Sequence, residues 1–480
     1  MKVVGISCPL KLGKHVGITS IHFPLSLGVV LACIRKHGFD IELWDYNVED
    51  FTEESFIQRL KKSNLGLVGL AAMTPSIKTA YKLATLIKAH SPHIVVVAGG
   101  PHVDALPVES MGEFPNFDVV VYGEAEETFV DLCERVERKE SLDGCLGIVH
   151  RKDGKIVKEP ARPLIKDLDK LPYAARDIVD FNNYKKAHVE RGLSRRFMNI
   201  MEFMTSRGCP ARCIFCASGA NKPPTVRWRS LDNVLGEIDE CVAKYGTNYV
   251  NLIDDTFTLN KNFVYGFCEA MKKRGLEWGC LTRVDCVTKE MLRTMVDSGC
   301  IRVSFGVETG SPRIMAMNGK AVTIDKVRQA FKWAHETRLR IIDGTFMIGS
   351  HPDENMEDIE QTIKLIREVK PTFFSVSIVT PIPGTAVYDM MKQEGLILTD
   401  SWEKFVYIGE TPSWRTKHFS PEELVKLQKY VMKKTYFRLG YLIPLLLRIR
   451  SINEFRYFAD IGFKSFKQII LEKKIQTFYS

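Results

Sequence analysis

The segment that decides the fold reads Gly208-Cys209-Pro210-Ala211-Arg212-Cys213-Ile214-Phe215-Cys216 and follows an apolar run at residues 199–205. Its three thiols are spaced C-x3-C-x2-C on one tight loop. Three thiolates placed in this way suit three irons of a [4Fe–4S] cluster, which cysteine usually ligates. Ordinary clusters and structural zinc sites take four protein ligands, and no Cys or His lies in the next twenty residues. The spacing therefore predicts a cluster with one open iron, and zinc or a chance spacing is the alternative.

Strands and helices are predicted to alternate on both sides of this loop. Short apolar runs indicate strands at 199–205, 249–253, 278–283, 302–307, 340–348 and 373–380, with helices at 230–244, 261–274, 289–298, 324–337 and 355–368. Such alternation indicates a parallel sheet. Six units are too few for a closed eightfold barrel, so we expect an open, partial (β/α)6 TIM barrel. Its chemistry should lie at the carboxyl ends of the strands.

The first 140 residues show the same alternation. Strands are predicted at 3–7, 41–45, 67–71, 94–98 and 119–122, and helices at 24–37, 52–62, 76–90 and 124–138. The pattern predicts an α/β fold, a doubly wound, Rossmann-like parallel sheet. Gly99-Gly100-Pro101-His102 follows the fourth strand and Gly123-Glu124 follows the fifth. Both segments should therefore lie at the edge where such sheets bind ligands.

Four regions are predicted along the chain. They are a sheet domain at 1–140, a hairpin and linker at 141–196, the partial barrel at 197–395, and a basic helical C-terminal region at 396–480. Residues 426–480 contain twelve Lys or Arg and three Asp or Glu, a surplus of nine that equals the net charge of +9 of the whole chain. The tail from residue 420 is predicted to be helical and amphipathic.

Composition indicates a globular protein in a reducing cytosol. Hydrophobic residues make up 45% and charged residues 26% of the chain, and the twelve cysteines are too scattered for a disulfide scaffold. The first residues are predicted to form a strand and not a secretory signal. The apolar run at 439–447 is shorter than the roughly 20 residues of a membrane-spanning helix. We expect a cytoplasmic protein, with membrane association through the tail as an alternative.

Cys209, Cys213 and Cys216, with the aromatic Phe215, resemble the signature of the radical SAM superfamily. The resemblance implies that S-adenosylmethionine (SAM) chelates the open iron and is cleaved to a 5′-deoxyadenosyl radical. It also implies cofactor contacts at later strand ends, for which the candidates are Arg283, Ser304, Glu308, Asp254, Asp255 and Gly349. Helix capping and solvation are the alternative roles for the acidic residues, and a structural salt bridge is the alternative for Arg283.

The N-terminal region resembles the cobalamin-binding module that precedes many radical SAM domains. The resemblance is carried by residues 24–28, by 69–74 with Thr74, and by the strand-end residues Gly99, Gly100, His102, Gly123 and Glu124. It implies bound cobalamin, although the Asp-x-His-x-x-Gly motif that supplies a cobalt ligand is missing. His102 could be a ligand or a polar surface residue. The cobalt could also lack a protein ligand from below, or the domain could have lost cobalamin.

Together the two modules resemble class B radical SAM methyltransferases. This implies an enzyme that methylates, cyclises or couples an unactivated carbon of a small-molecule or lipid substrate; the catalytic residues themselves stay unknown. The implied partners are that substrate and a reducing electron donor of the flavodoxin or ferredoxin type. The basic, aromatic tail fits either contact with anionic lipid or a helical cap over the open barrel. Nucleic acid is not expected, because no RNA-binding module is recognised.

Two other functions are open on sequence. A methylthiotransferase-like enzyme that modifies tRNA or protein would need a second cysteine set in the N-terminal region. Cys8, Cys33 and Cys133 lack the close spacing that such a set requires. A non-catalytic cobalamin or redox sensor would keep the fold without cleaving SAM.

Overall fold

The structure is a computed structural model. It describes residues 1–12, 21–185, 189–190, 193–194, 198–218, 224–406, 411–438, 440–441 and 455. The chain forms two compact units. The first consists of Met1–Val16, Ile21–Ala187 and Asp400–Phe405, and the second of Gly17–Ser20, His188–Thr399 and Val406–Ser480. The first unit therefore receives one short segment from far along the chain.

The first unit is built on a seven-stranded sheet with the strand order β2-β1-β3-β4-β5-β6-β7. Its parallel strands are β1 (Lys2–Ser7), β2 (Asp40–Asp45), β3 (Leu65–Ala71), β4 (Val95–Gly99) and β5 (Val119–Val121). The hairpin of β6 (Ile148–Lys152) and β7 (Lys155–Lys158) pairs antiparallel at one edge. The predicted doubly wound parallel sheet is confirmed, and the predicted hairpin extends it.

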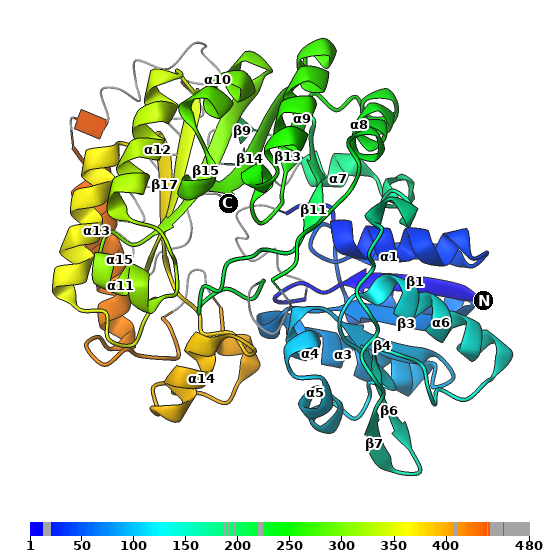
Figure 1. Cartoon of the computed structure of the whole chain (residues 1–480). Coiled ribbons are helices and arrows are strands. Elements are labelled where there is room, and N and C mark those ends of the chain that lie inside the picture. The colour runs from blue at the N-terminus through cyan, green and yellow to red at the C-terminus, as the bar shows by residue number, and fades with distance from the viewer. Residues whose placement is uncertain are drawn as a thin grey trace. The chain divides into compact units, whose positions relative to one another are not determined.

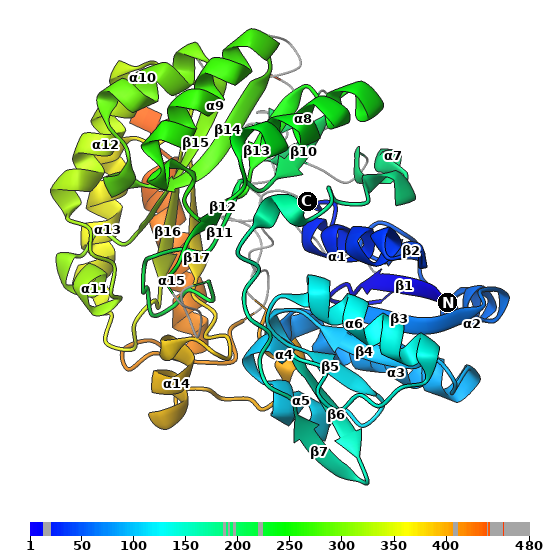
Figure 2. The ribbon, with the colours of Figure 1, turned by 45° about the vertical axis from the view of Figure 1, so that its right-hand side comes forward.

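Helices cover both faces of this sheet (Figure 2). α1 (Leu25–Lys36) and α6 (Ala125–Arg138) lie on one face, and α2 (Glu53–Lys62) and α3 (Ile77–His90) on the other. Strand β1 shows why, because successive side chains of a strand point to opposite faces. Gly5 lies against α1, where an added Cβ would come 3.0 Å from Leu27 and Leu31. Its neighbours Val4 and Ile6 instead join the buried cluster that contains α2 and α3.

The second unit contains six parallel strands in the order β10-β13-β14-β15-β16-β17. The strands are β10 (Ile200–Phe203), β13 (Tyr249–Leu252), β14 (Glu277–Arg283), β15 (Cys300–Glu308), β16 (Ile341–Ile348) and β17 (Phe373–Ile378). Figure 1 shows the helices outside the curved sheet: α8 (Leu231–Tyr245), α9 (Lys261–Arg274), α10 (Lys289–Asp297), α12 (Ile324–Glu336) and α13 (Met356–Val369). β10 and β17 are the edges of the sheet, so the predicted partial barrel is confirmed.

Local sequence explains where these outer helices begin. Each follows a residue whose side chain accepts a backbone hydrogen bond from the helix's first turn: Ser230, Asn260, Thr288, Thr323 and Asn355. Such caps satisfy N–H groups that have no partner within the helix, and each stabilises its helix by about 1 kcal/mol. Asp232 and Asp325 lie in the first turns, where a negative charge is favourable.

Helix α15 (Pro421–Tyr436) packs along the edge strand β17. Gln428 donates to the carbonyl of Val376 at 2.7 Å, Tyr436 donates to that of Phe374, and Tyr441 donates to that of Thr372 at 2.8 Å. The Tyr436 ring also stacks on the Phe374 ring at 4.1 Å between centroids. These contacts favour the helical cap over lipid contact for the described part of the tail.

Most of the basic tail, residues 442–454 and 456–480, lies outside the described residues. Among the helices that the structure does describe, none combines the length and the apolar character needed to cross a membrane.

Candidate functional site

The cysteine loop leaves the barrel sheet just after β10. Ser206–Arg207 (β11) pairs antiparallel with Arg227–Trp228 (β12), which closes the base of the loop. Gly208 follows with φ +98°, and a Cβ there would lie 2.3 Å from the carbonyl oxygen of Thr225. Only glycine fits this backbone conformation beside another chain segment. The sequence thus turns the chain sharply one residue before the first cysteine.

Asp254, at the carboxyl end of β13, anchors the entry to this loop. Its buried carboxylate accepts hydrogen bonds from the backbone N–H of Thr205 at 3.0 Å and of Ser206 at 2.5 Å. The hydroxyl groups of the same two residues donate to it at 2.8 and 2.6 Å. Burial raises the pKa of Asp254, and the four hydrogen bonds oppose that effect. Its described contacts thus hold β10 against β13 and aim the chain into the cysteine loop.

Two other segments support the far side of the loop. Ile214 donates its N–H to the carbonyl of Asn318 and accepts from the N–H of Val387, both at 3.1 Å. Asn318 ends the short helix α11 (Pro312–Met317), and Val387 lies in the first turn of α14 (Ala386–Gln393). Asp255, exposed beside Asp254, accepts from Ser218 of the same loop at 3.0 Å. The loop is therefore held at its base, its middle and its end.

The three thiols are free, and each is partly exposed. All three lie on one described loop segment, residues 209–216, at the carboxyl edge of the barrel sheet. Their exposure leaves the sulfur atoms accessible to an inorganic cofactor, which thiolates bind well.

Positive charges lie close to Cys213. Burial raises the pKa of this thiol, while Lys320 and Arg283 lower it. Lys320 is itself buried and donates to the carboxylate of Glu308 at 3.0 Å and to the carbonyl of Gly306 at 2.7 Å. Arg283 forms two hydrogen bonds of 2.9 Å to Asp285. The salt bridge that was the alternative for Arg283 is therefore present, beside the cysteine loop.

Glu308 has an uncommon backbone conformation for a residue other than glycine. Its φ is +76°, at the carboxyl end of β15. A Cβ on Gly306 would lie 2.7 Å from the Glu308 carboxylate and 3.3 Å from Lys320 Nζ, so glycine there leaves room for the ion pair. Strained residues of this kind concentrate at functional sites. Lys320 was not among the predicted residues, and its place directly after Gly319, in the loop between α11 and α12, was the only signal.

The other predicted barrel residues have protein partners. Ser304 is buried and donates to Asp343 at 3.0 Å, and Arg302 also contacts Asp343 at 3.2 Å. Gly349, with φ +66°, donates its N–H to the buried carboxyl of Glu354. Burial raises the pKa of Glu354 to about 8. Arg302, Ser304 and Asp343 thus link the adjacent strands β15 and β16, and Gly349 lies just beyond the carboxyl end of β16.

In the first unit, the predicted residues gather at the carboxyl ends of β3, β4 and β5. Nδ1 of His102 lies 3.3 Å from the hydroxyl of Thr74. His102 is buried, so the alternative of a polar surface residue is wrong. Its Nε2 has no hydrogen-bond partner among the described residues. Burial lowers the pKa of His102 to about 4, so the ring is neutral at physiological pH.

The glycines beside His102 leave space at this edge. A Cβ added to Gly99 or Gly123 would meet no atom within 4 Å. Gly100 has φ +109° and lies against the backbone of Ala72. Glu124, in contrast, accepts from the N–H of Ile165 at 2.9 Å and so contacts the linker. Within the described residues, the edge therefore combines open space beside two glycines with a buried ring nitrogen that lacks a hydrogen-bond partner, which fits a bulky ligand.

A buried carboxylate that was not among the predicted residues lies at the same edge. Asp45 ends β2, and burial raises its pKa. It accepts a hydrogen bond from the hydroxyl of Tyr184 at 2.8 Å and from the side chain of Asn47 at 2.8 Å. Its position at the carboxyl end of a predicted strand was the available signal.

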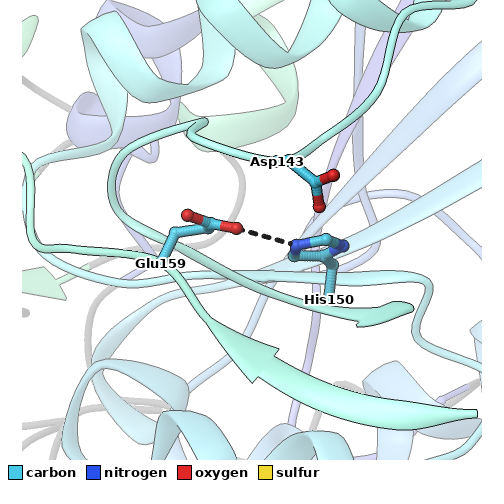
Figure 3. A group of neighbouring side chains, drawn as sticks. All are labelled: Asp143, His150 and Glu159. Atoms are coloured by element: carbon cyan, nitrogen blue, oxygen red, sulfur yellow. Dashed lines mark hydrogen bonds and ion pairs between the residues drawn. The ribbon is translucent and has the colours of Figure 1, made fainter. Parts of the chain in front are cut away.

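A second group of polar side chains lies on the hairpin of the first unit (Figure 3). His150 faces Glu159 at 3.2 Å, and Asp143 lies close to both. Lys152 pairs with Asp143 at 2.6 Å. The contacts of His150 and Lys152 thus link β6 to the residues just before and just after the hairpin.

The methylthiotransferase-like alternative needs a second set of accessible cysteines in the first unit. Cys8, Cys33 and Cys133 are each buried in the first unit, so a second cluster set there is not favoured. The methylthiotransferase-like function is therefore not favoured either.

Two family models match the chain, one in each unit. The model of the radical SAM superfamily matches residues 203–366, and that of the B12 binding domain matches residues 16–133. An uncharacterized methyltransferase of Pyrococcus horikoshii is 34% identical over 433 residues, which cover 90% of each chain. The anaerobic magnesium-protoporphyrin IX monomethyl ester cyclase of Cereibacter sphaeroides is 26% identical over 92% of this chain and 73% of that protein.

Solved structures agree on the fold. The cobalamin-dependent SAM radical enzyme OxsB superposes with a TM-score of 0.73 at 17% identity, over 98% of this chain and 71% of that one. The radical SAM methyltransferase TsrM of Kitasatospora setae superposes with a TM-score of 0.66 at 16% identity, over 83% of this chain and 79% of that one.

Proposed function

The chain belongs to the cobalamin-dependent radical SAM methyltransferase family, and from that premise we propose that it transfers a methyl group to an unactivated carbon of a small molecule. The observation that carries the proposal is the cysteine loop at the carboxyl edge of the barrel. Three partly exposed thiols lie there on a backbone that Asp254, Asn318 and Val387 hold in place.

The residues around the loop suit the cofactors of this family. When bound, a [4Fe–4S] cluster supplies one electron to cleave SAM, and cobalamin carries the methyl group. Cys209, Cys213 and Cys216 would hold the cluster. Lys320 and Arg283 place positive charge beside Cys213, which stabilises its thiolate and suits the SAM carboxylate. Glu308, fixed by Lys320, would accept from the SAM ribose or amino group.

The first unit offers the matching edge for cobalamin. In the part of the chain that the structure describes, Gly99 and Gly123 leave space at the strand ends, and Nε2 of the buried His102 has no hydrogen-bond partner. A large ring system needs such close backbone approach. We propose that cobalamin binds at this edge, with Thr74, Gly99, Gly100, His102 and Gly123 in contact with it.

The open face of the barrel sheet carries both apolar side chains and a hydroxyl group that could contact a substrate. Leu281 of the central strand β14 and Ile253, the residue after β13, are exposed, whereas the preceding residues Cys280 and Leu252 pair in the sheet and are buried. Because the helices cover the outer face, exposure places Ile253 and Leu281 on the open, concave face. Ser377 of the edge strand β17 is exposed too. A small molecule with an apolar portion therefore fits this face better than a highly charged one.

Two partners stay predictions. The electron for the cluster is proposed to come from a reducing carrier of the flavodoxin or ferredoxin type. Contact of the basic tail with a membrane is a separate prediction, which the packing of α15 against β17 does not require.

Anaerobic reconstitution tests the proposal. The wild-type chain should bind about four irons, as one cubane cluster requires, and should consume SAM when reduced. Cys213→Ala should lose both the iron–sulfur absorbance and SAM cleavage. Cys286→Ala, a variant at a partly exposed cysteine outside the loop, is the matched control and should keep both.

The outcome is clear in either direction. A Cys213→Ala variant that retains a full cluster and cleaves SAM would contradict the assignment. A cluster-loaded wild type that never cleaves SAM would instead favour a redox sensor.

A further inference from the structure

A short arm from the C-terminal part of the chain belongs to the first unit. Asp400–Phe405 lies in that unit, whereas the residues on either side belong to the barrel unit. The base of the arm is a β-bridge, in which Ile397 pairs antiparallel with Trp414. Leu398 donates to the carbonyl of Ser413 at 2.9 Å, and Arg415 donates to that of Leu396 at 3.0 Å. The chain therefore leaves the barrel unit at this bridge and returns to it, and residues 400–405 between the two strands of the bridge pack on the sheet of the first unit.

Trp402 is the main contact of this arm. Its ring meets the ring of His102 edge-on, with 4.9 Å between centroids. Its indole N–H donates to the carboxylate of Glu113 at 2.8 Å, and its ring packs against the hydrophobic core of the unit. Aromatic pairs in this geometry are favourable beyond the area they bury.

Polar contacts fix the arm beside Trp402. Lys78 of α3 donates to the hydroxyl of Ser401 at 2.9 Å and lies 3.8 Å from the carboxylate of Glu403. Phe405 is buried, and its ring lies 5.5 Å from that of Trp402. One lysine and two aromatic side chains thus hold a segment that is more than 200 residues away in the sequence from the sheet it covers.

The location of these contacts gives them a function. Thr74 begins the 3₁₀ turn that follows β3, and His102 lies in α4 (Pro101–Ala105), which follows β4. Both are therefore at the ligand edge of the sheet. Trp402 buries one side of the His102 ring, while Nε2 on that ring has no partner within the described structure.

We propose that Trp402 is a positioning residue for the cobalamin edge. Through the ring of His102 and the carboxylate of Glu113 it holds α4, α5 (Pro107–Glu113) and the turn at Thr74 in the arrangement that receives cobalamin. The inference rests on the proposed function, because it assumes that cobalamin binds there. Its consequence is that a residue encoded after the whole barrel sets the affinity of the N-terminal domain for its cofactor.

The test is a titration of the full-length, cluster-loaded chain with hydroxocobalamin under anaerobic conditions. Trp402→Ala should raise the dissociation constant by about tenfold, because it removes both the ring contact and the hydrogen bond. Trp402→Phe keeps a ring against His102 and should stay within about threefold of the wild type. Lys78→Met loosens the arm without changing Trp402, and it should weaken binding as well.

A matched control and a second readout separate positioning from general stability. Trp333→Ala removes a half-buried tryptophan from α12 of the barrel unit and should leave the dissociation constant unchanged. Cobalamin should quench part of the tryptophan emission of the wild type, and that part should be missing in Trp402→Phe. This signal shows that Trp402 lies near cobalamin, and the recovery of affinity in Trp402→Phe over Trp402→Ala separates positioning by the ring from a structural role.

The two proposals fail in different ways. If the wild type binds no hydroxocobalamin, then the cobalamin part of the proposed function is wrong. If the wild type binds it, and both Trp402→Ala and Lys78→Met bind equally well, then only the inference about the arm is wrong.

Discussion

At the scale of single residues, the site depends on the buried ion pair between Lys320 and Glu308, which sequence patterns do not predict. The side chains of Lys320 and Glu308 are 5% and 12% exposed, so each charge relies on the other. Removing one partner of a buried pair leaves an uncompensated charge in a poor solvent, which costs more than removing both. Lys320 is therefore both a structural residue and a source of positive charge that lowers the pKa of Cys213.

Lys320→Met should lower the free energy of unfolding by roughly 3 kcal/mol, because it strands the Glu308 carboxylate. The double variant Lys320→Met with Glu308→Gln should recover much of that loss, since the amide carries no charge. Urea unfolding of the three proteins measures both effects. Equal stability of the single variant and the wild type would show that solvent reaches this pair.

Glu354 gives a pH dependence whose direction follows from its burial. Its pKa is about 8 in the folded chain, against an ordinary value of 4.5 in the unfolded chain. Between these pH values the folded chain keeps a proton that the unfolded chain has released. The contribution of this proton to the free energy of unfolding is therefore fully present below pH 4.5 and is lost as the pH rises through 8.

We expect Glu354→Gln to remove this loss and to be more stable than the wild type at pH 8.5, by up to roughly 4 kcal/mol. Glu357→Gln changes an exposed glutamate three residues further along the chain, in the first turn of α13, and is the control. Thermal unfolding at pH 5 and pH 8.5 measures the difference. Parallel pH profiles for Glu354→Gln and the wild type would refute the assignment.

At the scale of elements, strand pairing fixes the base of the cysteine loop. Its base is the β11–β12 pair, and Gly208 makes the turn that leads to Cys209. The stiffness of the base explains how three side chains on an irregular segment can have one arrangement.

Gly208→Ala should prevent cluster assembly, because the new methyl group would meet the Thr225 carbonyl at 2.3 Å. Gly275→Ala is the matched control. Gly275 also has a positive φ, of +63°, but has open space around its Cβ position. The control should lose only about 1 kcal/mol of stability and should keep its iron. Iron and sulfide analysis after reconstitution decides, and full iron content in Gly208→Ala would contradict the prediction.

Periodicity predicted the long elements well and the short ones poorly. Helix α9 has the predicted bounds, and β13, β15 and β16 lie within two residues of theirs. The short helices α4, α5, α11 and α14 were missed, because five to eight residues hold too few turns to show a hydrophobic face. The hairpin of β6 and β7 was predicted, but its pairing with β5 was not, since register depends on packing.

At the scale of the whole molecule, the sequence placed the cysteines and the strand-end glycines correctly at carboxyl edges, because topology alone decides that. It could not find Lys320 or Trp402. Each acquires its role only when the chain folds back on an earlier element, 12 residues earlier for Lys320 and 300 for Trp402. The contacts that hold the site together are thus less visible in the sequence than the residues that carry its chemistry.

The packing of α15 on β17 has a practical consequence for anyone who wishes to shorten this protein. The backbone carbonyls of Phe374 and Val376 lie on the edge strand of the sheet. In the folded chain they accept hydrogen bonds from the side chains of Tyr436 and Gln428. A version cut before Ser420 would leave that border as an unpaired template for strands of neighbouring molecules, and unprotected borders of this kind drive self-association. A minimal catalytic fragment must therefore keep the helix that follows the barrel, even though no predicted site residue lies on it.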